Sequence, residues 1–173
     1  MNWRVLLSIS FTVLLALNCN AQDNLDLVRL KFHSIQDEKD LQEVINLSSK
    51  AEPQTTEGSI LEAYHAASIA RQADYTMFPH KKVQYFNKGK NLLELAIEDT
   101  PSLESVYLRL VIQLKTPKLL NYYQDINSDV QYVVENLASS NLPLVSKKLI
   151  KETLLDSTDD HELITSFNNI IFN

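Results

Sequence analysis

The chain has 173 residues, of which 45% are hydrophobic and 22% are charged, so it has the composition of a globular protein and the length for one domain with its own core. Its formal net charge of −6 favours solubility and argues against a nucleic-acid partner or an anionic-membrane surface. With two glycines and one cysteine, it lacks the glycine-rich phosphate and dinucleotide motifs and any pair of thiols.

The first twenty-one residues have the layout of a secretory signal peptide. Arg4 supplies the basic start, Val5–Leu17 supplies an apolar stretch, and Ala21 follows a small side chain two positions earlier. The apolar stretch is shorter than the ~20 residues that a membrane-spanning helix needs. We therefore expect cleavage after Ala21, export to the periplasm or the medium, and a single all-helical domain over residues 22–173 with no stable membrane span.

Cys19 is the only cysteine, and two fates compete for it. It could become the lipidated first residue of a lipoprotein, but Asn18 directly before it is a poor match to the small residue that such sites use. We favour its removal with the signal peptide. The mature chain then has no thiol, and we expect no disulfide, no metal ion and no cofactor.

After the signal peptide, apolar residues recur at steps of three and four, which is the spacing of one face of an α-helix. The five prolines lie between these periodic segments, where they end one helix or begin the next. The pattern predicts an all-α fold, an antiparallel helical-hairpin array or bundle of seven to nine helices, with no strand assigned. The expected helices are Leu25–Ile35, Leu41–Ser48, Ile60–Ala73, Val83–Glu98, Leu103–Leu114, Val130–Leu137, Val145–Leu154 and a last helix from Ser157 through Ile171. The first of these could also alternate with the two-residue period of a strand, and we favour a helix there.

Polar residues before these segments are the expected helix caps. We predict Asp37 or Asp40 for the second helix, Thr100 for the helix that begins at Leu103, and Ser128 or Asp129 for the sixth helix. For the last helix, Asp159 and Glu162 have the spacing of a capping box.

Gly89 falls inside an apolar helical face. A glycine there costs about 1 kcal/mol relative to alanine, so we expect a neighbouring helix to approach it closely. The alanine-rich segment Ile60–Ala73 would allow such an approach.

An alanine-bearing helix around Ala67 precedes a helix that ends in Ala96 and Pro101, and another helix follows at once. Over Leu61–Leu114 this order resembles a tetratricopeptide-type helix pair. The equivalent tyrosines, at positions 64 and 107, are 43 residues apart where that family repeats at 34, and no second copy follows.

The run Asp99–Glu104, then Tyr107–Leu114, with Pro117, Tyr122 and Asp129 beyond, is similar to a family of small exported helical proteins of Gram-negative bacteria. That family has no assigned activity. The resemblance implies an exported, helical protein and no particular reaction.

Arg109 is the first candidate binding residue, because it lies inside the most apolar helix. A charge there either reaches solvent or pairs with a carboxylate, and we favour an ion pair with Asp129 or Glu94 on a neighbouring helix. Gln113, one turn further on, could share its polar strip. Further candidate contact residues are the central tyrosines Tyr85, Tyr122 and Tyr123, of which Tyr122 and Tyr123 are expected to be exposed.

The sequence contains no nucleophile elbow and no His-Glu-x-x-His zinc motif. The leading hypothesis is therefore a non-enzymatic, exported helical interaction module for another envelope or secreted protein. One alternative is a small-ligand binder or enzyme with its site around Arg109 and the central tyrosines. Another is an inhibitor or immunity-type protein whose acidic surface blocks a basic partner. The oligomeric state and the identity of the partner do not follow from the sequence.

Overall fold

A computed structural model describes residues 23–51 and 55–172, so the predicted signal peptide and Cys19 lie outside the described residues. Across these two ranges the chain forms eight α-helices, two short 3-10 helices and no strand, which confirms the predicted all-α fold class. The helices are residues 23–33, α2 Glu38–Ser48, α3 Thr56–Arg71, η1 Gln72–Tyr75, α4 Pro79–Asp99, α5 Leu103–Lys115, η2 Lys118–Leu120, α6 Ile126–Asn136, α7 Leu144–Leu155 and α8 His161–Asn168.

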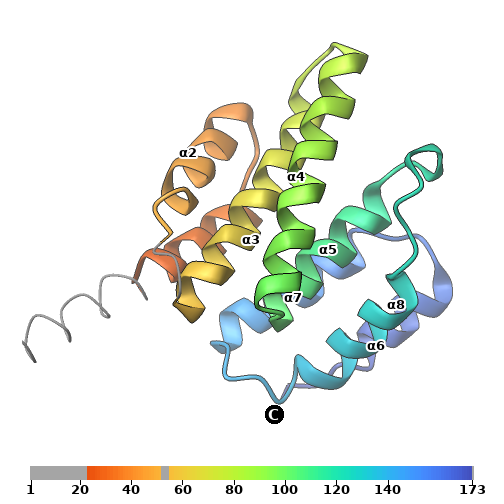
Figure 1. Ribbon diagram of the computed structural model, residues 1–173. Coiled ribbons are helices and arrows are strands. Elements are labelled where there is room, and N and C mark those ends of the chain that lie inside the picture. Colours follow the sequence, from red (N-terminus) through yellow and green to blue (C-terminus); the bar gives the residue numbers. More distant parts are fainter. Residues whose placement is uncertain (1–22, 52–54, 173) are drawn as a thin grey trace, which may run out of the picture.

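The α3–α4 hairpin forms the middle of the molecule (Figure 1). The 23–33 helix and α2 lie on one side of it, while α5 leads to α6, α7 and α8 on the other. No helix within residues 23–51 and 55–172 is both long enough and apolar enough to cross a bilayer.

Gly89 sets the distance between α3 and α4. A Cβ atom built at this position would lie 2.3 Å from the backbone nitrogen of Ala70 and 2.6 Å from the carbonyl oxygen of Ala66. Both obstacles are backbone atoms, which cannot rotate away. The prediction that a neighbouring helix approaches Gly89 closely is therefore confirmed.

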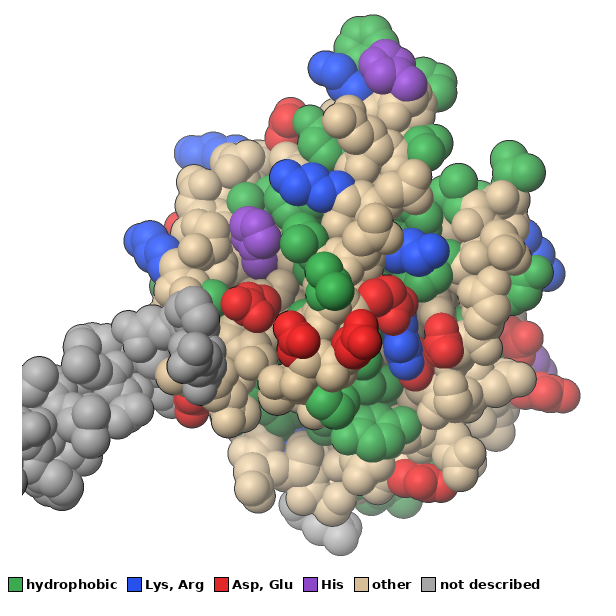
Figure 2. Space-filling view, viewed as in Figure 1, with side chains coloured by type: hydrophobic (Ala, Val, Ile, Leu, Met, Phe, Trp, Pro, Cys, Tyr) green, Lys and Arg blue, Asp and Glu red, His purple; other side chains and the backbone are tan. Residues whose placement is uncertain are grey.

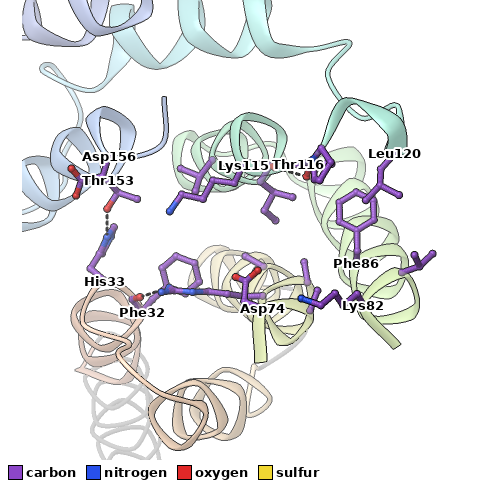
Figure 3. A pocket seen from close by; sticks show the side chains of 18 residues that line it. Phe32, His33, Asp74, Lys82, Phe86, Lys115, Thr116, Leu120, Thr153 and Asp156 are labelled. Atoms are coloured by element: carbon purple, nitrogen blue, oxygen red, sulfur yellow. Dashed lines mark hydrogen bonds between the residues drawn. The ribbon is translucent and has the colours of Figure 1, made fainter. Parts of the chain in front are cut away.

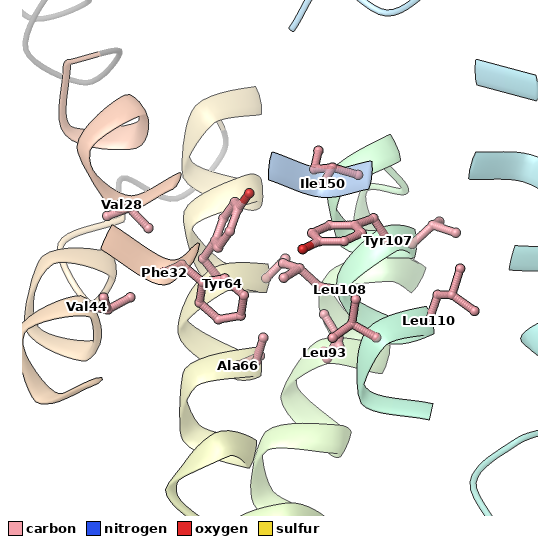
Figure 4. Close-up of a cluster of buried hydrophobic side chains, with 14 of the residues drawn as sticks. Val28, Phe32, Val44, Tyr64, Ala66, Leu93, Tyr107, Leu108, Leu110 and Ile150 are labelled. Atoms are coloured by element: carbon pink, nitrogen blue, oxygen red, sulfur yellow. The ribbon is translucent and has the colours of Figure 1, made fainter. Parts of the chain in front are cut away.

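One hydrophobic core runs from the 23–33 helix to α8. Its largest fully buried side chains are two tyrosines, Tyr64 and Tyr107, and Phe167. Tyr64 lies across from Phe32, with ring centroids 5.2 Å apart in an edge-to-face arrangement (Figure 4). Tyr107 lies on the α5 side of the same cluster, so aromatic side chains from three helices meet in the core.

Of the two helix caps predicted in the first part of the chain, the structure confirms one and corrects the other. Asp37 caps α2 as expected, because its carboxylate accepts the backbone N–H of Asp40 at 2.9 Å. Thr100 does not cap α5: Ser102 does, in a capping box with Ser105 in which each hydroxyl accepts the other residue's backbone N–H. Position 102 is directly before the first helical residue, which position 100 is not.

The two later predictions of helix starts are wrong. Helix α6 begins at Ile126, ahead of Ser128 and Asp129, so both of these lie inside the helix. Helix α8 begins at His161, and the cap is Asp160, whose carboxylate accepts the N–H groups of residues 162 and 163. Asp159 therefore lies one residue too early to form the predicted capping box.

Candidate functional site

A cleft with a volume of about 530 Å³ opens to solvent between the 23–33 helix, α3, α4, α5 and α7. Its size is in the usual range of binding pockets in proteins. No single segment forms it, since its lining residues come from positions between 32 and 156. They are Phe32, His33, Ala67, Ala70, Arg71, Ala73, Asp74, Lys82, Val83, Phe86, Val111, Ile112, Lys115, Thr116, Pro117, Leu120, Thr153 and Asp156.

The cleft has a polar end, while its other end carries both apolar and polar side chains (Figure 3). Phe86 and Leu120 lie at this mixed end, together with Lys82 and Thr116. His33, Thr153 and Asp156 lie at the opposite end. A bound group therefore meets large apolar side chains beside a lysine and a threonine at one end, and an imidazole, a hydroxyl and a carboxylate at the other.

His33 is held in place at the polar end. Its Nδ1 atom shares a 2.8 Å hydrogen bond with the hydroxyl of Thr153, and its ring stacks on Tyr107 with centroids 6.0 Å apart. Burial, together with the nearby charge of Arg71, lowers the pKa of His33 to about 4. The imidazole is thus neutral at pH 7 and is a weak base, better suited to hydrogen bonding than to proton abstraction.

Arg71 joins the end of α3 to the 23–33 helix below the cleft. Its guanidinium donates to the carbonyl oxygens of Phe32 at 3.1 Å and Ile35 at 3.4 Å, and it lies over the Phe32 ring. These contacts connect the polar end of the cleft to the core, so that the wall is fixed by hydrogen bonds as well as by packing.

The charges on the lining are mixed. Lys82 and Lys115 carry positive charge, while Asp74 and Asp156 carry negative charge. No ion pair within residues 23–51 and 55–172 involves any of these four side chains. They remain available to a bound group of either sign.

Arg109 lies outside the cleft, in a polar network between α4, α5 and α6. It makes a two-point ion pair with Asp129, at 2.8 Å and 2.7 Å, and a third bond of 3.1 Å to Glu94. The prediction that a carboxylate on a neighbouring helix pairs with Arg109 is confirmed for both Asp129 and Glu94. The bonds to Asp129 are the main reason that the pKa of Arg109 is raised.

The structure brings two other predicted residues into this network. The hydroxyl of Tyr122 donates a short hydrogen bond to Glu94, and the side-chain amide of Gln113 donates to Asp125 at 3.1 Å. Tyr122 is only 3% exposed, so the expectation that it is an exposed contact point is wrong. Its ring packs on Phe86 instead, since the loop after α5 folds back over α4.

The remaining two predicted residues take no part in the network. Tyr123 is 49% exposed, as expected. Tyr85 is half-buried on α4, nine residues before Glu94, which is roughly 13 Å along a helix. The five predicted residues therefore do not form one site.

A second buried ion pair was not predicted. Arg29 makes a two-point contact with Glu104, at 2.8 Å and 2.6 Å, and the Tyr64 hydroxyl donates to the same carboxylate at 2.9 Å. Although burial by itself would lower the pKa of Arg29, its bonds to Glu104 and Asp26 raise it overall. The sequence did carry the signal, since Arg29 stands between Val28 and Leu30 just as Arg109 stands between two leucines.

Within the described part of the chain, no group of three or more His, Cys, Asp or Glu side chains is arranged to hold a metal ion. What the cleft offers chemically is an apolar wall, a neutral imidazole, a hydroxyl and separate charges of both signs. In comparisons with known proteins, no family model, no curated protein and no solved structure matches this chain.

Proposed function

We propose that this protein is a non-enzymatic, exported helical interaction module that holds apolar side chains of a partner protein in the cleft between α3, α4, α5 and α7. The observation that carries this proposal is the open, partly apolar cleft with exposed apolar residues on its lining and directly next to it in the sequence. Val83 on its wall is 42% exposed, and Leu119, next to the lining residue Leu120, is 94% exposed. Isolated exposed leucines are common, but apolar residues beside an open apolar cleft favour a binding surface.

The hydrogen bonds of Arg109 and the pKa of His33 also support a binding role over a catalytic one. Arg109 is already bonded to two carboxylates and has little capacity left to anchor a ligand. His33 is the one histidine on the cleft lining, and its low pKa makes it a poor general base at pH 7. We therefore assign these groups a structural role.

A small-molecule ligand is the second candidate function. The 530 Å³ volume and a lining that combines large apolar side chains with hydrogen-bonding and charged ones would suit an amphipathic molecule. Mass spectrometry of the purified native protein distinguishes the two, because a tightly held ligand adds a constant mass to the folded chain that disappears on denaturation.

The test of the interaction module uses two matched variants. Val83→Asp places a carboxylate on the cleft wall, and Val145→Asp makes the same change at an exposed residue of α7 that does not line the cleft. Each protein is used for affinity capture from cell envelopes at physiological salt, followed by mass spectrometry.

We expect one or a few proteins to be captured by the unchanged chain and by Val145→Asp, with at least ~10-fold less captured by Val83→Asp, because a partner's apolar group would meet a charge there. Equal capture by both variants would place the interface elsewhere. Recovery of no partner would count against the proposal.

A further inference from the structure

A second surface, separate from the cleft, lies between α2 and α4 with α3 beside them. We propose that this groove is the docking site for a basic amphipathic helix of a partner protein. The proposal does not depend on the cleft, and it is carried by three features of the groove: its exposed leucines, its carboxylates and the helix ends that meet there.

The apolar part of the groove comes from α4. Leu92, Leu95 and Asp99 lie at positions i, i+3 and i+7, so they share one face of the helix, and all three line the groove. Leu92 is 37% exposed and Leu95 is 55% exposed. With Ala51 and Ala96 they border a hollow of about 370 Å³. Two neighbouring leucines at a hollow between helices suit the apolar stripe of a docked helix.

The charge at the groove has one sign. Glu62 and Asp99 are its charged lining residues, and no lysine or arginine lines it. Neither carboxylate has an ion-pair partner among residues 23–51 and 55–172. His65, which also lines the groove, has its pKa lowered chiefly by burial and also by Lys88, a residue outside the lining.

Two helix ends add to this negative potential. Helix α2 ends at Ser48 and α4 ends at Asp99, both of which line the groove. The carbonyl groups at the end of a helix carry a partial negative charge that a basic side chain normally offsets. Neither α2 nor α4 has a basic residue in its last turn, and the nearest lysine to the end of α2 is Lys50, two residues beyond it and outside the lining. The face seen in Figure 2 shows acidic side chains across its middle, with hydrophobic side chains and a basic side chain among them.

These features fit a helix with leucine-like side chains along one face and lysine or arginine beside them. The leucines would bury its apolar stripe, while the carboxylates and the helix ends would attract its cations. Within the groove itself, an acidic side chain would meet only negative formal charges, since Lys88 acts on His65 from outside the lining.

The probe is a synthetic amidated peptide of about 15 residues, with leucines on one helical face and lysines elsewhere. A matched peptide has glutamate in place of each lysine. Binding to the folded chain is measured by calorimetry at low and physiological salt. Three altered chains are compared: Leu95→Asp, the pair Glu62→Gln with Asp99→Asn, and a control pair, Glu135→Gln with Glu152→Gln, on α6 and α7.

We expect the lysine peptide to bind, more weakly as salt rises, and the glutamate peptide not to bind. Leu95→Asp should weaken binding at least ~10-fold although it adds a negative charge, because it removes an apolar contact. The pair Glu62→Gln with Asp99→Asn should weaken binding, with each lost carboxylate contributing about a two- to fivefold decrease in affinity. The control pair should bind like the unchanged chain. Circular dichroism confirms that each variant is folded.

Three results would overturn the proposal. Leu95→Asp could bind the lysine peptide as well as or better than the unchanged chain, which would reveal attraction by charge alone. The control pair could lose as much affinity as the groove pair. Light scattering could show a dimer that Leu95→Asp dissociates, in which case a second copy of this chain occupies the groove.

Discussion

At the scale of single residues, the most consequential group is the carboxylate of Glu104. It is 2% exposed and accepts hydrogen bonds from both Arg29 and Tyr64. A buried arginine that loses its partner keeps the cost of leaving water without the compensating attraction. The contact also joins residues 75 positions apart, so it fixes the 23–33 helix against α5.

We predict that Glu104→Gln lowers the free energy of unfolding by about 3 kcal/mol, because it removes the buried counter-charge of Arg29 and leaves only the more exposed Asp26 to pair with it. Denaturation by urea, followed by circular dichroism, measures this change. The control is Glu98→Gln at an exposed position of α4, which should lie within about 0.5 kcal/mol of the unchanged chain. Equal stability of the two variants would show that the ion pair contributes little.

His33 gives a second prediction at this scale. Its pKa of about 4 in the folded chain lies below the ordinary value of 6.5, so between these pH values the unfolded chain binds more protons. The stabilisation is therefore complete above pH 6.5 and is lost as the pH falls towards 4, by up to about 3 kcal/mol at 1.36 kcal/mol per unit. His33→Gln should flatten this pH dependence in urea titrations, whereas His161→Gln, at an exposed position, should not. Identical pH profiles for the two variants would contradict the assignment.

The role of a single charged residue could be predicted from the sequence only where a nearby segment offered a carboxylate to pair with it. For Arg109, an isolated charge in an apolar helix predicted a pair, and Asp129 and Glu94 were the carboxylates proposed for it on neighbouring helices. Arg29 carried the same signal, but its partner lies 75 residues away and no local pattern points to it. Tyr122 was expected to be exposed because it follows a proline, yet the loop turns it inward onto Phe86.

At the scale of elements, the contact between α3 and α4 depends on small residues on both helices. The backbone of Ala66 and Ala70 lies where a side chain at position 89 would be. This contact makes the hairpin tight, and the hairpin in turn places residues 82, 83 and 86 of α4 on the cleft lining.

We predict that Gly89→Ala destabilises the protein by about 1–3 kcal/mol, even though alanine favours helix more than glycine does. The added methyl group must push α3 and α4 apart, because the atoms it meets are backbone. Asn91→Ala, at an exposed position two residues on, is the control for helix propensity and should be neutral or slightly stabilising. Thermal unfolding compares the two, and a Gly89→Ala protein as stable as Asn91→Ala would refute the close approach.

The helices themselves were largely predictable, because apolar spacing and proline positions both mark them. The ends were less so. Thr100 and Ser102, or Asp159 and Asp160, are chemically able to cap, and a difference of one or two residues is decided by the backbone path that packing imposes. Knowing where the helices lie in the sequence also does not predict which of their faces border a cleft, because that depends on the angles at which the helices cross.

At the scale of the whole molecule, residues 23–51 and 55–172 form an all-helical core that is crossed by buried ion pairs and carries the cleft and the groove on its surface. These ion pairs, Arg29 with Glu104 and Arg109 with Asp129, are formed by the two arginines that lie within apolar helical segments of the sequence. The cleft could not be predicted, because its lining is drawn from five helices and the loops between them. Export remains a prediction from residues 1–21.

The most direct test of the interaction module is site-specific photo-crosslinking in living cells. The full chain, with its own N-terminal residues, is produced with a photo-reactive phenylalanine analogue at position 83 or, as the control, at position 145. We predict one discrete crosslinked protein at position 83, absent at 145 and lost when Leu120, another apolar lining residue, is changed to Asp. Crosslinking of the same proteins at both positions, or at neither, would contradict a partner held in the cleft.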